Sequence, residues 1–260
     1  MELLKRVIPA IIFIPLILGI FYLGGIALLS FLGLVVLLQV FELREMFLKK
    51  NVTISLITIP FSVIIFLVFS QFSANEMFLS VVVFFIFISG IDLFSQKLEG
   101  ASERISHNIF VVFYSPILLS FVYRLRTLSN GKYLILSLLV LIWIVDTFAY
   151  FVGMSIGKHR GIFKASPNKS LEGFLAGIVF GILGAFVAGK IFEFSGLEIF
   201  ALAISAGIFG QFGDLVESLI KRDVGVKDSS NLLPGHGGIV DRFDSITLAA
   251  PIFYLIINLF

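Results

Sequence analysis

Hydrophobic residues occur in long runs with short polar interruptions along this chain of 260 residues. A helix needs about 20 apolar residues to cross the hydrocarbon core of a bilayer. The runs predict nine spanning helices, at roughly residues 6–23, 25–41, 52–71, 77–94, 106–127, 132–153, 171–190, 197–221 and 244–260. The runs are continuously apolar, not alternating, and an open sheet would leave backbone groups unpaired in lipid. The pattern therefore predicts an all-α membrane bundle, and it shows no internal repeat.

The composition supports a membrane location for most of the chain. Hydrophobic residues make up 58% and charged residues 14%, with 31 phenylalanines, whereas soluble proteins carry about 25% charged residues. A net charge of +2 gives no indication of a nucleic-acid partner. The absence of cysteine excludes disulfides and thiolate metal sites.

The basic residues divide unequally between the two sides of the predicted bundle. If the N-terminus is cytoplasmic, 15 of the 19 Lys and Arg residues face the cytoplasm, and the other side holds Arg124, Arg126, Lys132 and Lys190. Cytoplasmic loops are enriched in Lys and Arg, so this division predicts a cytoplasmic N-terminus and a C-terminus on the opposite side. The apolar run after Lys5 and Arg6 continues to about Phe41, which favours a hairpin of two spanning helices over a cleaved signal peptide.

Polar residues concentrate in the second half of the chain. Two predicted cytoplasmic loops, at about 154–170 and 222–243, hold both histidines and two of the three prolines of this half, together with six glycines and three aspartates. Long polar loops of this kind are more often functional than simple connectors. We therefore expect a scaffold over residues 1–140, which includes a dimer surface, and a catalytic region over residues 141–260.

A polar stripe runs along the eighth predicted span. Intervals of three and four residues place Gln211, Asp214, Ser218 and Lys221 on one helical face, with Glu217 beside them. An acidic residue within a membrane costs about 2.5–3.5 kcal/mol on insertion scales. The stripe is therefore expected to face protein or a water-filled cavity. Hydrogen bonding between helices is the alternative explanation.

A glycine-rich stretch precedes the last predicted span, and it reads LPGHGGIVDRFD from residue 233 to residue 244. Glycines allow backbone amides to approach an anion closely. Asp241, Asp244 and Ser245 share a helical face, and carboxylates near Asp214 would suit Mg²⁺ together with phosphate oxygens. Helix capping is the alternative for one aspartate. His236 is not expected to bind zinc, since the other histidines are distant in sequence and no cysteine is present.

Four cations accompany these carboxylates: Lys221, Arg222, Lys227 and Arg242. The simpler explanation is that cytoplasmic loops are rich in basic residues, but cations mixed with carboxylates and glycines favour a phosphate-rich substrate.

The sixth span adds a third polar group, which begins with Asp146. Further along the same helical face, Gly153 and Gly157 form a small-xxx-small pair that permits close helix packing. Ser166 and Pro167 are expected to start the next helix as N-cap and first-turn residues. Lys169 then lies where it would reach a phosphate or a lipid headgroup.

The stretch from Ser218 to Asp244 resembles the signature of the phosphatidate cytidylyltransferases, also called CDP-diacylglycerol synthases. Its eleven fixed positions are Ser218, Lys221, Arg222, Lys227, Asp228, His236, Gly237, Gly238, Asp241, Arg242 and Asp244. Residues 146–173 also resemble an upstream segment of the family, with Asn168 and Ser170 as mild departures. Together these matches cover about a fifth of the chain.

The resemblance implies a Mg²⁺-dependent reaction of CTP with phosphatidate that yields CDP-diacylglycerol and pyrophosphate. It also implies a homodimer and a two-cation centre at Asp214 and Asp241. On this basis we expect catalytic roles for Lys221, Arg222, Lys227, Asp228, His236, Arg242 and Asp244. Substrate contacts are expected from Asp146, Lys169, Ser218, Gly237 and Gly238. The active site is expected to face the cytoplasm, at a bacterial inner membrane.

Two other functions remain open at this point. A CTP-dependent lipid alcohol kinase would share the substrate CTP, although the full signature argues against it. A membrane transporter would explain an acidic residue within a span, but the charges crowd one membrane face. A CDP-alcohol phosphatidyltransferase would need a DGxxAR…GxxxDxxxD pattern that the chain lacks.

Overall fold

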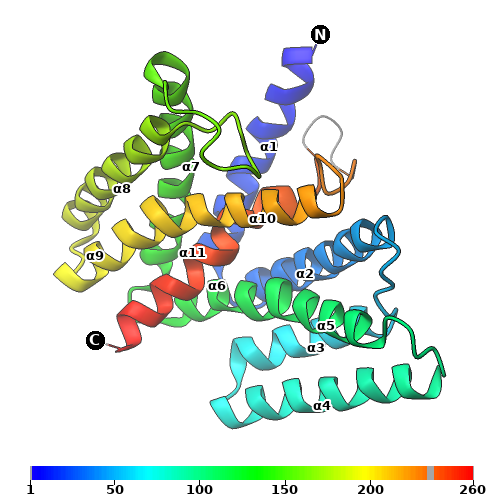
Figure 1. Cartoon of the computed structure of the whole chain (residues 1–260). Coiled ribbons are helices and arrows are strands. Elements are labelled where there is room, and N and C mark those ends of the chain that lie inside the picture. Colours follow the sequence, from blue (N-terminus) through cyan, green and yellow to red (C-terminus); the bar gives the residue numbers. More distant parts are fainter. Residues whose placement is uncertain (1, 233–236, 260) are drawn as a thin grey trace.

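The computed structural model of this protein is a bundle of helices (Figure 1). It describes residues 2–232 and 237–259, with side chains described from Phe13 onward. Over these residues the helices are α1 (Glu2–Leu23), α2 (Gly25–Leu48), α3 (Thr58–Gln71), α4 (Ala74–Phe94), α5 (Ala101–Val112), α6 (Leu118–Thr127), α7 (Gly131–Ile156), α8 (Leu171–Phe192), α9 (Gly196–Ile204), α10 (Gln211–Asp223) and α11 (Val240–Leu259). No strand occurs among them, so the prediction of an all-α fold is confirmed.

Two short π-helical segments join neighbouring helices into longer rods. The segment η1 (Phe113–Ile117) links α5 to α6, and η2 (Ser205–Gly210) links α9 to α10. The described residues therefore form nine helical rods, which match the nine predicted segments. Six rods are long and apolar enough to cross a membrane: α2, α4, α5–α6, α7, α8 and α9–α10. How many of the nine rods cross the bilayer stays a prediction.

The main apolar core lies where α2, α6, α7, α9 and α11 meet. Leu32, Leu119, Leu138, Leu202 and Phe253 come from these five helices, and all are completely buried. In Figure 1 the pair α3 and α4 lies on the side of the bundle away from α7 and α8. The core thus holds α11 in the middle of the bundle, in contact with α6, η2 and α10.

Arginine side chains mark one end of the bundle. Arg126, at the end of α6, donates from Nε to the carbonyl oxygen of Phe21 at 3.1 Å. Arg124 donates from a terminal nitrogen to the carbonyl oxygen of Phe72 at 2.5 Å. The α1–α2, α3–α4 and α6–α7 turns therefore lie together at this end.

The polar loops gather at the other end. Lys50 after α2 pairs with Asp223 at the end of α10, with 2.8 Å between nitrogen and oxygen. Arg222 donates from Nε to the carbonyl oxygen of Ala165 at 3.3 Å, which joins the loop between α7 and α8 to the end of α10. The two loops predicted to be functional are thus on the same side of the bundle.

The start of α8 differs from the prediction. Its N-cap is Ser170, whose Oγ accepts a hydrogen bond from the Gly173 amide at 3.1 Å, so the assignment of Ser166 and Pro167 as cap and first turn is wrong. The Gly161 amide donates to the carbonyl oxygen of Pro167 at 3.0 Å. This hydrogen-bonded turn precedes α8, which begins only where the chain again lies beside α7.

Candidate active site

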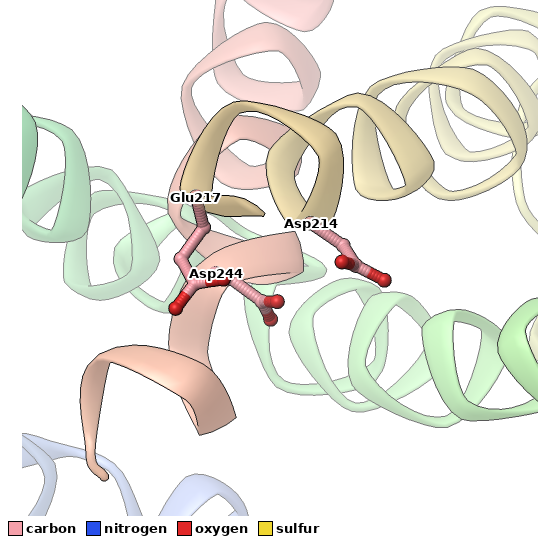
Figure 2. A group of neighbouring side chains, drawn as sticks. All are labelled: Asp214, Glu217 and Asp244. Atoms are coloured by element: carbon pink, nitrogen blue, oxygen red, sulfur yellow. The ribbon is translucent and has the colours of Figure 1, made fainter. Parts of the chain in front are cut away.

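Three carboxylates from two helices form the centre of the polar region. Asp214 and Glu217 extend from α10, and Asp244 extends from α11 (Figure 2). Each offers a carboxylate oxygen within 4.8 Å of the others. The side chain of Glu217 is 1% exposed, whereas Asp214 retains 35% exposure, so the group extends from the protein interior toward an accessible surface.

A glycine allows α10 and α11 to approach closely enough for this cluster. A Cβ atom on Gly213 would lie 2.9 Å from the Cα atom of Ser245, closer than real Cβ contacts allow. The two helices therefore pack backbone to backbone at this point. The residues that follow Gly213 on α10 are in this way placed directly beside the first turns of α11.

Two lysines pair with carboxylates of this region. Lys169 Nζ lies 2.6 Å from Asp214 Oδ2. Lys221 Nζ lies 2.5 Å from both Glu217 Oε2 and Asp241 Oδ1. Lys169 comes from the loop before α8, so the structure joins both predicted functional loops in one charged site, as the sequence pattern indicates.

Asp241 contacts both the preceding loop and α10. Its Oδ2 accepts hydrogen bonds from the Gly238 amide at 2.7 Å, the Ser229 amide at 3.0 Å and the Ser229 hydroxyl at 2.7 Å. Its Oδ1 pairs with Lys221 on α10. The three-carboxylate group does not include Asp241, and the metal site expected at Asp214 and Asp241 stays a prediction.

Several other predicted site residues lie around this centre. Ser218 Oγ lies 3.4 Å from Asp214 Oδ1, at the long limit for a hydrogen bond. Asp146 on α7 is within electrostatic range of Asp214 and Lys169. Gly237 has a φ of +76°, a left-handed conformation that favours glycine.

The remaining predicted residues that the structure describes are exposed. Arg222 donates to main-chain oxygens, including that of Val226 at 3.0 Å. Lys227 and Asp228 lie in the connection between α10 and α11, and Arg242 lies in the first turn of α11. His236 lies outside the described residues.

Glu42 on α2 is a polar residue of this region that the sequence interpretation did not include. It is 2% exposed and accepts hydrogen bonds from the segment between α10 and α11, and one from the Val240 amide of α11 at 2.8 Å. The available signal was an acidic residue directly after a predicted span, where a buried charge needs partners. Part of the predicted scaffold therefore contacts the site.

The three-carboxylate group has the properties of a hard-cation site. Carboxylate oxygens are the ligands that Mg²⁺ prefers. Glu217 Oε1 is buried and accepts no hydrogen bond from the described residues, so one strong acceptor within the group is left for a ligand. The donor set and this unused oxygen fit a divalent cation.

The whole-chain comparison decides the family. A model of the Cytidylyltransferase family matches residues 4–260. The chain belongs to the cytidylyltransferase family. Among similar family members, the phosphatidate cytidylyltransferase of Staphylococcus haemolyticus is 34% identical over 261 residues, which cover 98% of this chain and 97% of the relative.

Two other cytidylyltransferases are more similar over shorter stretches. The phosphatidate cytidylyltransferase of Bacillus subtilis is 47% identical over 123 residues, or 46% of each chain. That of Aquifex aeolicus is 41% identical over 147 residues, or 56% of this chain and 55% of the relative. The family resemblance inferred from the signature is confirmed.

Proposed function

We propose that this protein is a phosphatidate cytidylyltransferase, which converts CTP and phosphatidate to CDP-diacylglycerol and pyrophosphate. The observation that carries the proposal is the similarity of nearly the whole chain to relatives with that activity in their names. The joined site of Asp214, Glu217 and Asp244 with Lys169 and Lys221 provides charges of both signs for such substrates.

The reaction requires positioning and charge neutralisation more than acid–base chemistry. A phosphate oxygen of phosphatidate attacks the α-phosphorus of CTP and forms a new P–O bond. The bond from this phosphorus to the oxygen bridging to the β-phosphate breaks, and pyrophosphate leaves with that electron pair. No covalent enzyme intermediate is required, because the lipid phosphate is itself the nucleophile. The task of the protein is to hold two anionic groups together.

Lysine residues and carboxylates have separate tasks in this scheme. Lys169 and Lys221 are accessible to solvent to different degrees and would contact substrate phosphates. The predicted cations Arg222, Lys227 and Arg242 would contribute further positive charge near the site. Asp214, Glu217 and Asp244 would hold Mg²⁺, whereas a metal role for Asp241 stays a prediction. When bound, Mg²⁺ supplies positive charge to the phosphate oxygens. Asp241 instead fixes Lys221 and the preceding loop.

The site is proposed to face the cytoplasm of a bacterium, with nine helices crossing the inner membrane and the C-terminus outside. The distribution of Lys and Arg supports this orientation. The two polar loops and the α2–α3 connection share one end of the bundle, which agrees with it. A cytoplasmic site has access to CTP, and phosphatidate would enter sideways from the bilayer. Assembly as a homodimer stays a prediction.

The direct test measures CDP-diacylglycerol and pyrophosphate formation by the purified protein in detergent, with CTP and phosphatidate. We expect turnover that requires both the lipid and Mg²⁺, and that EDTA abolishes it. Asp214→Asn and Asp244→Asn should lose turnover by about 100-fold or more, the scale of losing a main electrostatic contribution. Asp223→Asn is the matched control, because Asp223 is an exposed acid on the same helix, paired with Lys50.

The products separate this function from its alternatives. CDP together with a phosphorylated lipid alcohol, when an alcohol replaces phosphatidate, would identify a lipid kinase. If folded protein turns over no CTP with either lipid, an enzymatic function is contradicted. That result would favour a transport role for the acidic residues.

A further inference from the structure

Glu42 connects the N-terminal half of the chain to the active-site loop. Its Oε1 accepts hydrogen bonds from the Ser230 hydroxyl at 2.5 Å and the Ile239 amide at 2.9 Å. Its Oε2 accepts from the Ser229 hydroxyl at 3.1 Å and the Val240 amide at 2.8 Å. A buried carboxylate needs several such donors to remain stable away from water, and here each donor lies about 190 residues away in sequence.

These donors come from two places in the chain. Ser229 and Ser230 lie within the connection between α10 and α11, whereas Ile239 and Val240 lie where α11 begins. A single carboxylate therefore ties the inner part of this connection to its end, between the two helices that carry the acidic cluster. The amides of Ile239 and Val240 also belong to the start of α11, where a negative charge is favourable.

The same contacts extend directly to Asp241. The Ser229 hydroxyl lies within hydrogen-bonding distance of both Glu42 Oε2 and Asp241 Oδ2, and its one hydrogen is available to either carboxylate. The Gly238 amide donates to Asp241, while a Cβ on Gly238 would lie 2.6 Å from either oxygen of Glu42. Glycine is thus required for the loop to pass between the two acids.

From these contacts we infer that Glu42 is a positioning residue for cytidylyl transfer, an inference that rests on the proposed function. Glu42 holds residues 229–230 against residues 239–240 so that Asp241 stays aligned with Lys221, and Lys221 in turn lies beside the acidic cluster. The residue touches no reacting atom. It affects the reaction indirectly, by fixing the position of the loop and of the side chains of Asp241 and Lys221.

The amide substitution Glu42→Gln tests this role. It keeps the side-chain shape but replaces one accepting oxygen by an NH₂ group, which faces the N–H of a backbone amide, so two donors oppose each other. We expect kcat to fall by about 10- to 100-fold, the usual effect of losing a partner that orients an active-site group. Glu42→Asp keeps both oxygens and should retain several-fold more activity than Glu42→Gln. Glu45→Gln, a carboxylate change at an exposed site on the same helix, should match the wild type.

Two further measurements separate positioning from simple stability. Activities are compared per folded protein, at a temperature well below the unfolding midpoint of every variant. Ser230→Ala removes one donor to Glu42 and should lower kcat by a few-fold with little change in stability. Hydrogen exchange of peptides that contain Ile239 and Val240 should become faster in Glu42→Gln and remain unchanged in Glu45→Gln.

The outcomes are distinguishable from failure of the proposed function. If the wild type forms no CDP-diacylglycerol, the proposed function and the catalytic role of Glu42 both fail, whereas the loop contacts are judged by hydrogen exchange alone. If the wild type is active, wild-type kcat in folded Glu42→Gln would overturn the inference. So would a lower unfolding temperature in Glu42→Gln with unchanged kcat per folded molecule, because that result assigns Glu42 to stability only.

Discussion

Replacement of Lys221 by methionine should destabilise the protein strongly in the absence of metal. Lys221 is 12% exposed, and its two partners, Glu217 and Asp241, are 1% and 9% exposed. Methionine has a similar length but no charge, so it leaves two buried carboxylates without their shared cation. Removal of one partner from a buried ion pair costs about 3–5 kcal/mol. This cost corresponds to a decrease of roughly 150- to 5,000-fold in the folding equilibrium constant.

The control for this prediction is a lysine of the same end of the bundle that is exposed to water. Lys50 pairs with Asp223, and their side chains are 41% and 55% exposed. An exposed pair contributes about 0–1 kcal/mol, so Lys50→Met should change the stability little. Both variants are unfolded by increasing SDS in mixed micelles that contain EDTA, because a bound cation would otherwise replace the missing charge beside Glu217.

A second substitution tests the cause. If unpaired carboxylates produce the loss, then Glu217→Gln in the Lys221→Met background should restore part of the stability, since one buried charge is then removed as well. Equal stability of Lys221→Met and Lys50→Met would refute the reasoning. It would mean that the carboxylates around Lys221 are well solvated, contrary to their burial in the structure.

Two further predictions concern the packing and the orientation of the bundle. A Cβ on Gly173 would lie 2.6 Å from the carbonyl oxygen of Ala149, so Gly173→Ala should separate α7 from α8 and lower stability by about 1–3 kcal/mol in a detergent unfolding assay. Gly196→Ala is the control, because a Cβ there meets open space and should have little effect on stability. Equal losses of stability in the two variants would contradict this packing. The chain has no cysteine, so a single introduced cysteine reports the side of the membrane on which it lies. Ser129→Cys should react with an impermeant maleimide from outside the cell, and Lys164→Cys should react only after permeabilisation. The reverse pattern would invert the proposed orientation.

The hydrophobic pattern was sufficient for much of the fold. Continuous apolar runs form helices because a helix satisfies its own backbone hydrogen bonds, and this rule depends on local sequence alone. For the same reason, spacing along one helix placed Asp214, Ser218 and Lys221 on a common face of α10. The signature from Ser218 to Asp244 was also sufficient to indicate the family, because it depends on residue types at set intervals in one stretch of chain.

Contacts between helices required the tertiary structure. Sequence spacing places Asp241 and Asp244 on one face, but only the structure shows that Asp241 binds the preceding loop and Lys221, whereas Asp244 lies beside Asp214 and Glu217. The position of Glu42 beside Val240 depends on how α2 packs against the end of the chain, and no local pattern records that packing. Local sequence thus determined the helices and the chemistry they carry. The tertiary structure decided which charged groups meet, because the charge partners come from distant segments whose approach is set by packing.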